Sequence, residues 1–209
     1  MPDELRVRVL RTLRVDDLEV EMGRPAHRIA AVAHRADRRT VAGDQHADDG
    51  GPHAAVVVAA LGRRGRRLGV GGWSYGGILT NYVIASTDRF KAAISGSGMS
   101  NMLGGYGIDQ YARTWEAELG KPWENTDAWL RLSYPFLEAD SISTPTLFLC
   151  GAADFNVPLA ASEQMYQALK SLDVPTKLII YPEQFHSFTR ASFIHDKRQR
   201  YLDWYDRYV

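Results

Sequence analysis

From residue 68 onward, apolar positions alternate between two patterns along the chain. Apolar runs at residues 68–70, and within 89–98, 144–158 and 176–182, predict buried strands followed by loops. Segments 78–84, 159–172 and 193–208 carry apolar residues at helical spacing, the first of them on most faces. Strands that alternate with helices over short connections predict an α/β fold with a mostly parallel sheet and helices on its faces.

Residues 101–140 interrupt this alternation with predicted helices that are rich in Trp and Tyr. We expect this insertion to roof a site. The aromatic residues of the last segment follow one helical face, so they are interpreted as a core stripe and not as a cofactor-binding motif; they are Phe193, Tyr201, Trp204 and Tyr208.

The composition changes sharply near residue 67. Every Trp, Tyr, Phe, Lys, Ser and Asn of the chain lies after it, and residues 1–67 consist mostly of Arg, Ala, Val, Asp, Gly, His and Leu. GC-rich coding DNA gives such a composition when it is read in the wrong frame. We therefore divide the chain into residues 1–67, an atypical segment interpreted as frame-shifted or poorly ordered, and residues 68–209. The alternation of apolar residues between Leu5 and Met22 leaves a small β-rich extension as the alternative.

Charge and cysteine content exclude several classes of protein. The 209 residues carry no formal net charge, so there is no electrostatic footprint for nucleic acid or an anionic membrane surface. The His and Asp residues between positions 34 and 53 lack the spacing of a recognised metal site. The apolar run at 54–61 is too short to span a bilayer, and the N-terminus lacks the apolar region of a signal peptide. With Cys150 as the only cysteine, these features predict a cytoplasmic protein without metal or cofactor, whose oligomeric state stays open.

The stretch "GWSYG" at 72–76 fits the pattern G-x-S-x-G. In this pattern a strand turns sharply into a helix and holds the central serine in a strained, exposed position. A predicted strand precedes Ser74 and a predicted helix follows it, as the pattern requires. A glycine-rich loop that happens to carry a serine is the alternative, so the partners of Ser74 decide between the two.

Two further residues supply those partners. Asp154 and His186 each follow a predicted strand directly, and open α/β sheets place their reactive groups just beyond the carboxyl ends of the strands. Considered alone, Asp154 is typical of a turn or a helix cap, and His186 is typical of a surface histidine. Considered together with Ser74, their order along the chain, Ser, Asp, His, matches that of α/β-hydrolases.

Residues 68–209 resemble the C-terminal half of the catalytic domain of prolyl oligopeptidase-family serine peptidases, in particular the dipeptidyl-peptidase and acylaminoacyl-peptidase-like branches. The motifs that carry the resemblance are "GWSYGG", "LGKPWEN", "SISTPTLFLCGAADFNVP", "EQMYQALK" and "YPEQFHSF". The resemblance implies an α/β-hydrolase fold and a short peptide as substrate. It implies Ser74 as the nucleophile, His186 as the general base and then acid, and Asp154 as the residue that orients the imidazole.

The resemblance also implies residues that bind the substrate. The backbone N–H of Tyr75, directly after the nucleophile, is expected to donate to the oxyanion. Asn156 and Val157 match positions that contact a substrate carbonyl and line its pocket, although both also suit a helix start. Trp115 and Tyr111 in the insertion are expected to complete an apolar pocket, with ordinary core packing as the alternative.

The chain also departs from the family pattern. Only 67 residues precede the predicted nucleophile strand, so the family's N-terminal strands and β-propeller are expected to be missing and the second oxyanion donor is unidentified. Without those strands, the strand that ends near Val70 is expected to form an edge of the sheet and to promote aggregation. A carboxylesterase-like hydrolase and an inactive remnant or non-catalytic binding domain remain the alternative functions.

Overall fold

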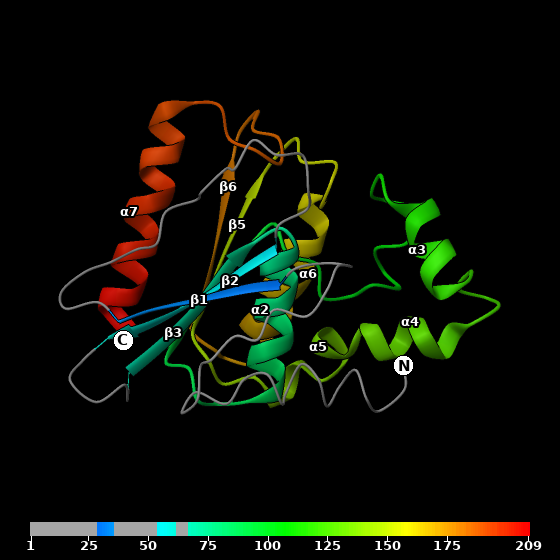
Figure 1. Cartoon of the computed structure of the whole chain (residues 1–209), viewed down its shortest axis with the longest axis horizontal. Coiled ribbons are helices and arrows are strands. Elements are labelled where there is room, and N and C mark those ends of the chain that lie inside the picture. Colours follow the sequence, from blue (N-terminus) through cyan, green and yellow to red (C-terminus); the bar gives the residue numbers. More distant parts are fainter. Residues whose placement is uncertain (1–28, 36–53, 62–66) are drawn as a thin grey trace.

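The computed structural model describes residues 29–35, 54–61 and 67–209, the first two ranges as backbone only (Figure 1). Within these ranges, six strands form one sheet in the order of the sequence. They are β1 (Ile29–Arg35), β2 (Ala54–Leu61), β3 (Arg67–Trp73), β4 (Ala92–Gly96), β5 (Thr146–Gly151) and β6 (Thr176–Tyr181). The last four run parallel to one another, which confirms the predicted α/β fold with a parallel sheet.

The expectation that β3 lies at the sheet edge is wrong. β2 pairs with β3 in antiparallel register, with Val58 opposite Val70, and β1 pairs with β2 in parallel. β1 and β2 both lie within residues 1–67, where neither strand was predicted. The β-rich alternative for Leu5–Met22 falls outside the described residues.

Two layers of helices cover the sheet, because side chains along a buried strand alternate between its faces. On one face, α2 (Tyr75–Ser86) and α6 (Leu159–Ser171) pack against Ala93 and Phe148. On the other face, α7 (Ala191–Tyr208) packs against Ile94 and Leu147 and forms a separate core with them (Figure 1). The predicted helices and strands after residue 67 are therefore confirmed.

The insertion between β4 and β5 forms a third cluster beside this body (Figure 1). It contains α3 (Ala112–Leu119), α4 (Thr126–Leu132), α5 (Tyr134–Leu137) and the 3₁₀ helix η1 (Ala139–Ser141). Trp129 is fully buried there, and its indole N–H donates to the carbonyl oxygen of Gly120 at 3.0 Å. No helix in the described ranges is long and apolar enough to cross a membrane.

Candidate active site

Ser74 occupies the turn between β3 and α2. Its φ of 60° and ψ of −121° place it in a region that residues with a side chain rarely adopt. Two backbone hydrogen bonds hold the turn: Ser74 N–H donates to Gly96 O at 2.9 Å, and Ile78 N–H donates to Ser74 O at 3.0 Å. The sequence pattern thus produces a strained turn between a strand and a helix, as G-x-S-x-G predicts.

Glycines are required around this turn because backbone segments approach one another closely. A Cβ at Gly72 would lie 2.5 Å from the carbonyl carbon of Gly76, and a Cβ at Gly77 would lie 2.4 Å from Gly96 O. Both distances are shorter than a van der Waals contact. Helix α2 can therefore start directly beside the ends of β3 and β4.

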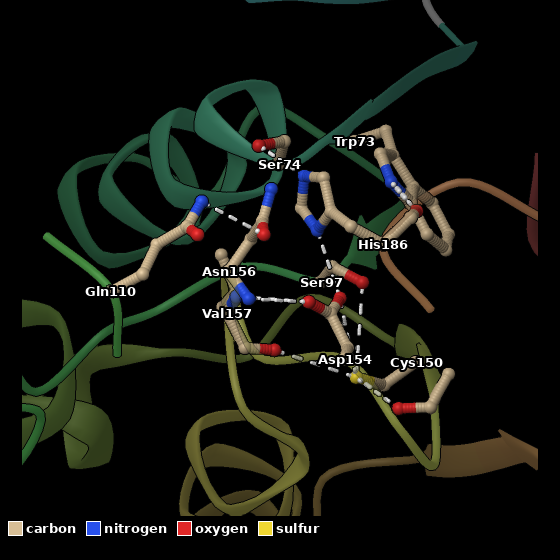
Figure 2. Close-up of polar contacts among 10 residues, drawn as sticks. Trp73, Ser74, Ser97, Gln110, Cys150, Asp154, Asn156, Val157 and His186 are labelled. Carbon is tan, nitrogen blue, oxygen red and sulfur yellow. Dashed lines mark hydrogen bonds and ion pairs between the residues drawn. The ribbon is translucent and has the colours of Figure 1, made fainter. Parts of the chain in front are cut away.

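A chain of hydrogen bonds links Ser74, His186 and Asp154 (Figure 2). Ser74 Oγ lies 2.7 Å from His186 Nε2, and His186 Nδ1 lies 2.8 Å from Asp154 Oδ2. Asp154 follows β5 and His186 follows β6, and parallel strands bring these loops to the same edge of the sheet. The structure thus brings together three residues that lie on separate loops of the sequence.

The carboxylate of Asp154 is fully buried, whereas the His186 side chain is 19% exposed. Oδ1 of Asp154 accepts the backbone N–H groups of Asn156 and Val157, both at 3.0 Å. These bonds satisfy one carboxylate oxygen and leave the other to accept from His186 Nδ1–H. An ionised carboxylate held in this way fixes the orientation of the imidazole ring and leaves Nε2 facing Ser74.

Cys150 lies below the carboxylate, with its Sγ 4.0 Å from Asp154 Oδ2. Burial raises the pKa of the Cys150 thiol to about 12, and the negative charge of Asp154 adds to the effect. The thiol is therefore protonated at neutral pH and acts as a small apolar residue there.

The residues predicted to bind the substrate lie at the start of α2, in the loop after β5 and in the insertion. Tyr75 is the first residue of α2, so its N–H has no carbonyl partner within the helix. The side-chain oxygen of Asn156 accepts from Gln110 Nε2 at 2.9 Å, so the insertion contacts the loop after β5 (Figure 2). Gln110 was not predicted as a site residue.

The three residues predicted to form the apolar pocket lie in the hydrophobic cluster around Trp129 or next to it; they are Val157, Trp115 and Tyr111. Val157 is buried, and Trp115 packs against the same cluster. The Trp115 indole N–H donates to Asp109 Oδ2 at 2.9 Å, and the Tyr111 ring meets the Trp115 ring edge-on at 6.3 Å. Trp115 thus makes core contacts, the alternative that the sequence left open for it, and Val157 is buried in the same cluster.

Three aromatic residues beside the site were also not predicted from the sequence. The Trp73 indole N–H donates to the backbone oxygen of His186 at 3.1 Å. Phe155 and Phe185 are more than half exposed and meet edge-on at 6.1 Å. Each phenylalanine adjoins Asp154 or His186 in the sequence, which is the signal that would have identified them.

The sequence model of the Prolyl oligopeptidase family matches residues 39–209, most of the chain. The chain belongs to the prolyl oligopeptidase family. The match begins ahead of β2, so part of the segment before residue 68 is included in it.

Individual relatives agree with this membership. The chain is 33% identical over 150 residues to the uncharacterized peptidase YuxL of Bacillus subtilis, covering 69% of this chain and 22% of that protein. It is similar to the structure of Pyrococcus horikoshii acylaminoacyl peptidase, with 28% identity, a TM-score of 0.62, and coverage of 69% of this chain and 24% of the other. It is also similar to a puromycin-hydrolyzing peptidase of Mycobacterium tuberculosis, with 26% identity, a TM-score of 0.63, and coverage of 68% and 22%. The chain thus spans less than a quarter of the length of these relatives.

Proposed function

We propose that this chain carries the catalytic residues of a serine-type peptidase that hydrolyses short peptides through an acyl-enzyme on Ser74. The observation that carries the proposal is the hydrogen-bonded chain from Ser74 Oγ through His186 to Asp154, with distances of 2.7 and 2.8 Å. The strained turn that presents Ser74 supports the same role. The family relatives include proteins named as peptidases, which favours an amide bond as the target.

In the first step, Ser74 Oγ attacks the scissile carbonyl while its proton passes to His186 Nε2. Asp154 stabilises the imidazolium that forms, because its buried carboxylate accepts from Nδ1–H. The N–H of Tyr75 donates to the oxyanion. His186 then gives its proton to the leaving amine, and the bond between carbonyl carbon and nitrogen breaks to leave an acyl-enzyme.

In the second step, His186 takes a proton from water, which attacks the acyl carbonyl. The bond between the acyl carbon and Ser74 Oγ then breaks, His186 returns the proton to Ser74 Oγ, and the carboxylic acid product leaves. Asn156 is assigned to contact a carbonyl of the substrate through its amide nitrogen, since its side-chain oxygen already accepts from Gln110 Nε2. Val157, Trp115 and Tyr111 contribute the apolar pocket.

Labelling with a fluorophosphonate tests the nucleophile, because this reagent reacts covalently with an activated serine. We expect the purified chain to be labelled, and Ser74→Ala and His186→Ala to abolish labelling. A parallel panel of aminoacyl amides and acyl esters separates peptidase from esterase. Ester turnover without amide turnover would assign the chain as an esterase, and absence of both labelling and turnover would favour the non-catalytic alternative.

In an active protein, Ser74→Ala is expected to lower kcat by about 10⁴ to 10⁶. Ser86→Ala is the matched control, because Ser86 is an exposed serine at the other end of α2. If Ser74→Ala keeps most of the activity of the parent, the nucleophile assignment is wrong.

A further inference from the structure

Trp73 is linked both to the proposed nucleophile and to the proposed base. It is the last residue of β3, directly before Ser74, and its indole N–H donates to the backbone oxygen of His186 at 3.1 Å. Figure 2 shows this bond on the side of His186 away from Ser74. A residue fixed to the nucleophile by one peptide bond thus holds the main chain of the proposed base.

Several neighbours contact the indole. Its ring packs directly against Gly96 of β4, where a Cβ would lie only 2.1 Å from a ring carbon. The Phe188 ring packs edge-on against it at 5.2 Å, and Lys197 Nζ of α7 lies 4.3 Å from the ring centroid. Lys197 is buried, and an ammonium over an indole face is attracted to the ring.

The loop that carries His186 needs such an anchor because it has no regular secondary structure between β6 and α7. The side-chain oxygen of Gln184 accepts the N–H groups of Thr189 and Arg190, and its backbone oxygen accepts from Ala153 N–H. These bonds fix the loop on both sides of His186. Asp154 fixes the imidazole at Nδ1, and Trp73 fixes the main chain of the same residue.

We propose that Trp73 is a positioning residue for the reaction, which keeps His186 Nε2 within hydrogen-bond reach of Ser74 Oγ through its bond to the His186 backbone. This inference rests on the proposed function for its kinetic consequence, but the position of the imidazole can be measured without catalysis. A small displacement of a catalytic group can cost about 10²-fold in rate, so even one lost anchoring bond is detectable.

Trp73→Phe removes the N–H donor and keeps an aromatic ring in the same place. We expect kcat to fall about 10- to 100-fold with little change in KM, because His186 acts in the transition state and not in substrate binding. Site-specific replacement of Trp73 by 3-benzothienylalanine is a second variant, since it exchanges only the N–H for sulfur and keeps the size of the indole. It is expected to lower kcat in the same way.

Trp204→Phe is the matched control. Its indole N–H also donates to a backbone oxygen, that of Pro145 at 3.4 Å, and it packs in the same core as Trp73. Pro145 precedes β5, whereas Asp154 follows it, so this bond lies at the opposite end of the sheet. We expect this variant to alter thermal stability without altering kcat or the NMR signal of the proton on His186 Nδ1.

The readout that does not depend on activity is the proton on His186 Nδ1, which is expected far downfield in the NMR spectrum because of its bond to Asp154. Both Trp73 variants should shift or broaden this signal, and Trp204→Phe should leave it unchanged. If the signal responds in this way but no variant or parent hydrolyses any substrate, positioning is supported and the peptidase proposal fails. The inference is overturned if the signal is unaffected in the Trp73 variants, if it is absent in the parent, or if Trp204→Phe changes kcat equally.

Discussion

Asp154→Asn should inactivate the site while leaving the fold intact. Oδ1 of Asp154 accepts two backbone N–H groups at 3.0 Å, from Asn156 and Val157. The oxygen of the new amide must take this place, because an NH₂ there would face two donors. The NH₂ group then occupies the position of Oδ2, 2.8 Å from His186 Nδ1, and donates to it.

This arrangement selects the wrong tautomer of His186. When Nδ1 accepts, the ring proton moves to Nε2, which lies 2.7 Å from Ser74 Oγ and can then no longer take the serine proton. A tautomer error of this kind costs about 10⁴ in kcat, or about 5 kcal/mol of transition-state stabilisation. The free energy of unfolding should change by only about 1 kcal/mol, because both backbone N–H groups keep an acceptor.

Asp154→Ala provides the contrast. It leaves two N–H groups without their acceptor at about 1–3 kcal/mol each, a large part of the roughly 5–15 kcal/mol that holds a domain together. The assays are kcat on an aminoacyl amide, thermal unfolding by circular dichroism, and ¹⁵N NMR of the imidazole. If Asp154→Asn keeps more than about a tenth of the parent kcat, or if Nδ1 stays protonated, the tautomer argument is wrong.

The remaining predictions concern the proposed base, the thiol and the tight turn. First, His186→Ala should lower kcat by about 10⁴ to 10⁶, because His186 accepts the Ser74 proton; a variant that keeps most of the parent activity contradicts this role. Second, the raised pKa of about 12 for Cys150 predicts no alkylation by iodoacetamide at pH 8.5 until the chain is unfolded. Because the unfolded thiol ionises near its ordinary pKa of 9.0, ionisation of Cys150 should reduce stability as the pH rises from there toward 12; rapid alkylation of the native chain would refute its burial. Third, Gly77→Ala forces a methyl group to within 2.4 Å of Gly96 O, so it should destabilise the fold by about 1–3 kcal/mol and abolish fluorophosphonate labelling; unchanged labelling and melting temperature would show that the turn tolerates a side chain.

The sequence predicted the convergence of Ser74, Asp154 and His186 because each follows its own strand. Parallel strands end at one edge of the sheet, so chain order and strand position suffice to bring such residues together. The contact between Trp73 and His186 was not predictable in this way. It depends on the conformation of the loop after β6, which side-chain periodicity does not encode.

The pairing of β2 with β3 was missed for a different reason. The run at 54–61 is apolar throughout and shows no alternation, and β1 is an Ala-rich segment. Strand pairing uses backbone N–H and C=O groups that every residue except proline offers, so the composition of residues 1–67 did not exclude it. The expectation of an exposed β3 edge was wrong because it was derived from the family strands that were expected to be missing.

The interior position of β3 bears directly on the strain at Ser74. A residue with a side chain in this backbone conformation costs about 1–3 kcal/mol and persists only when its surroundings fix it. β4 pairs with the end of β3 through Trp73 and Gly96, and β2 pairs with it through Gly72 and Val56. Both neighbouring strands pair with the last residues of β3, so the turn begins from a strand that is hydrogen-bonded on two sides. These pairings help to offset the conformational free energy that the strained backbone of Ser74 costs.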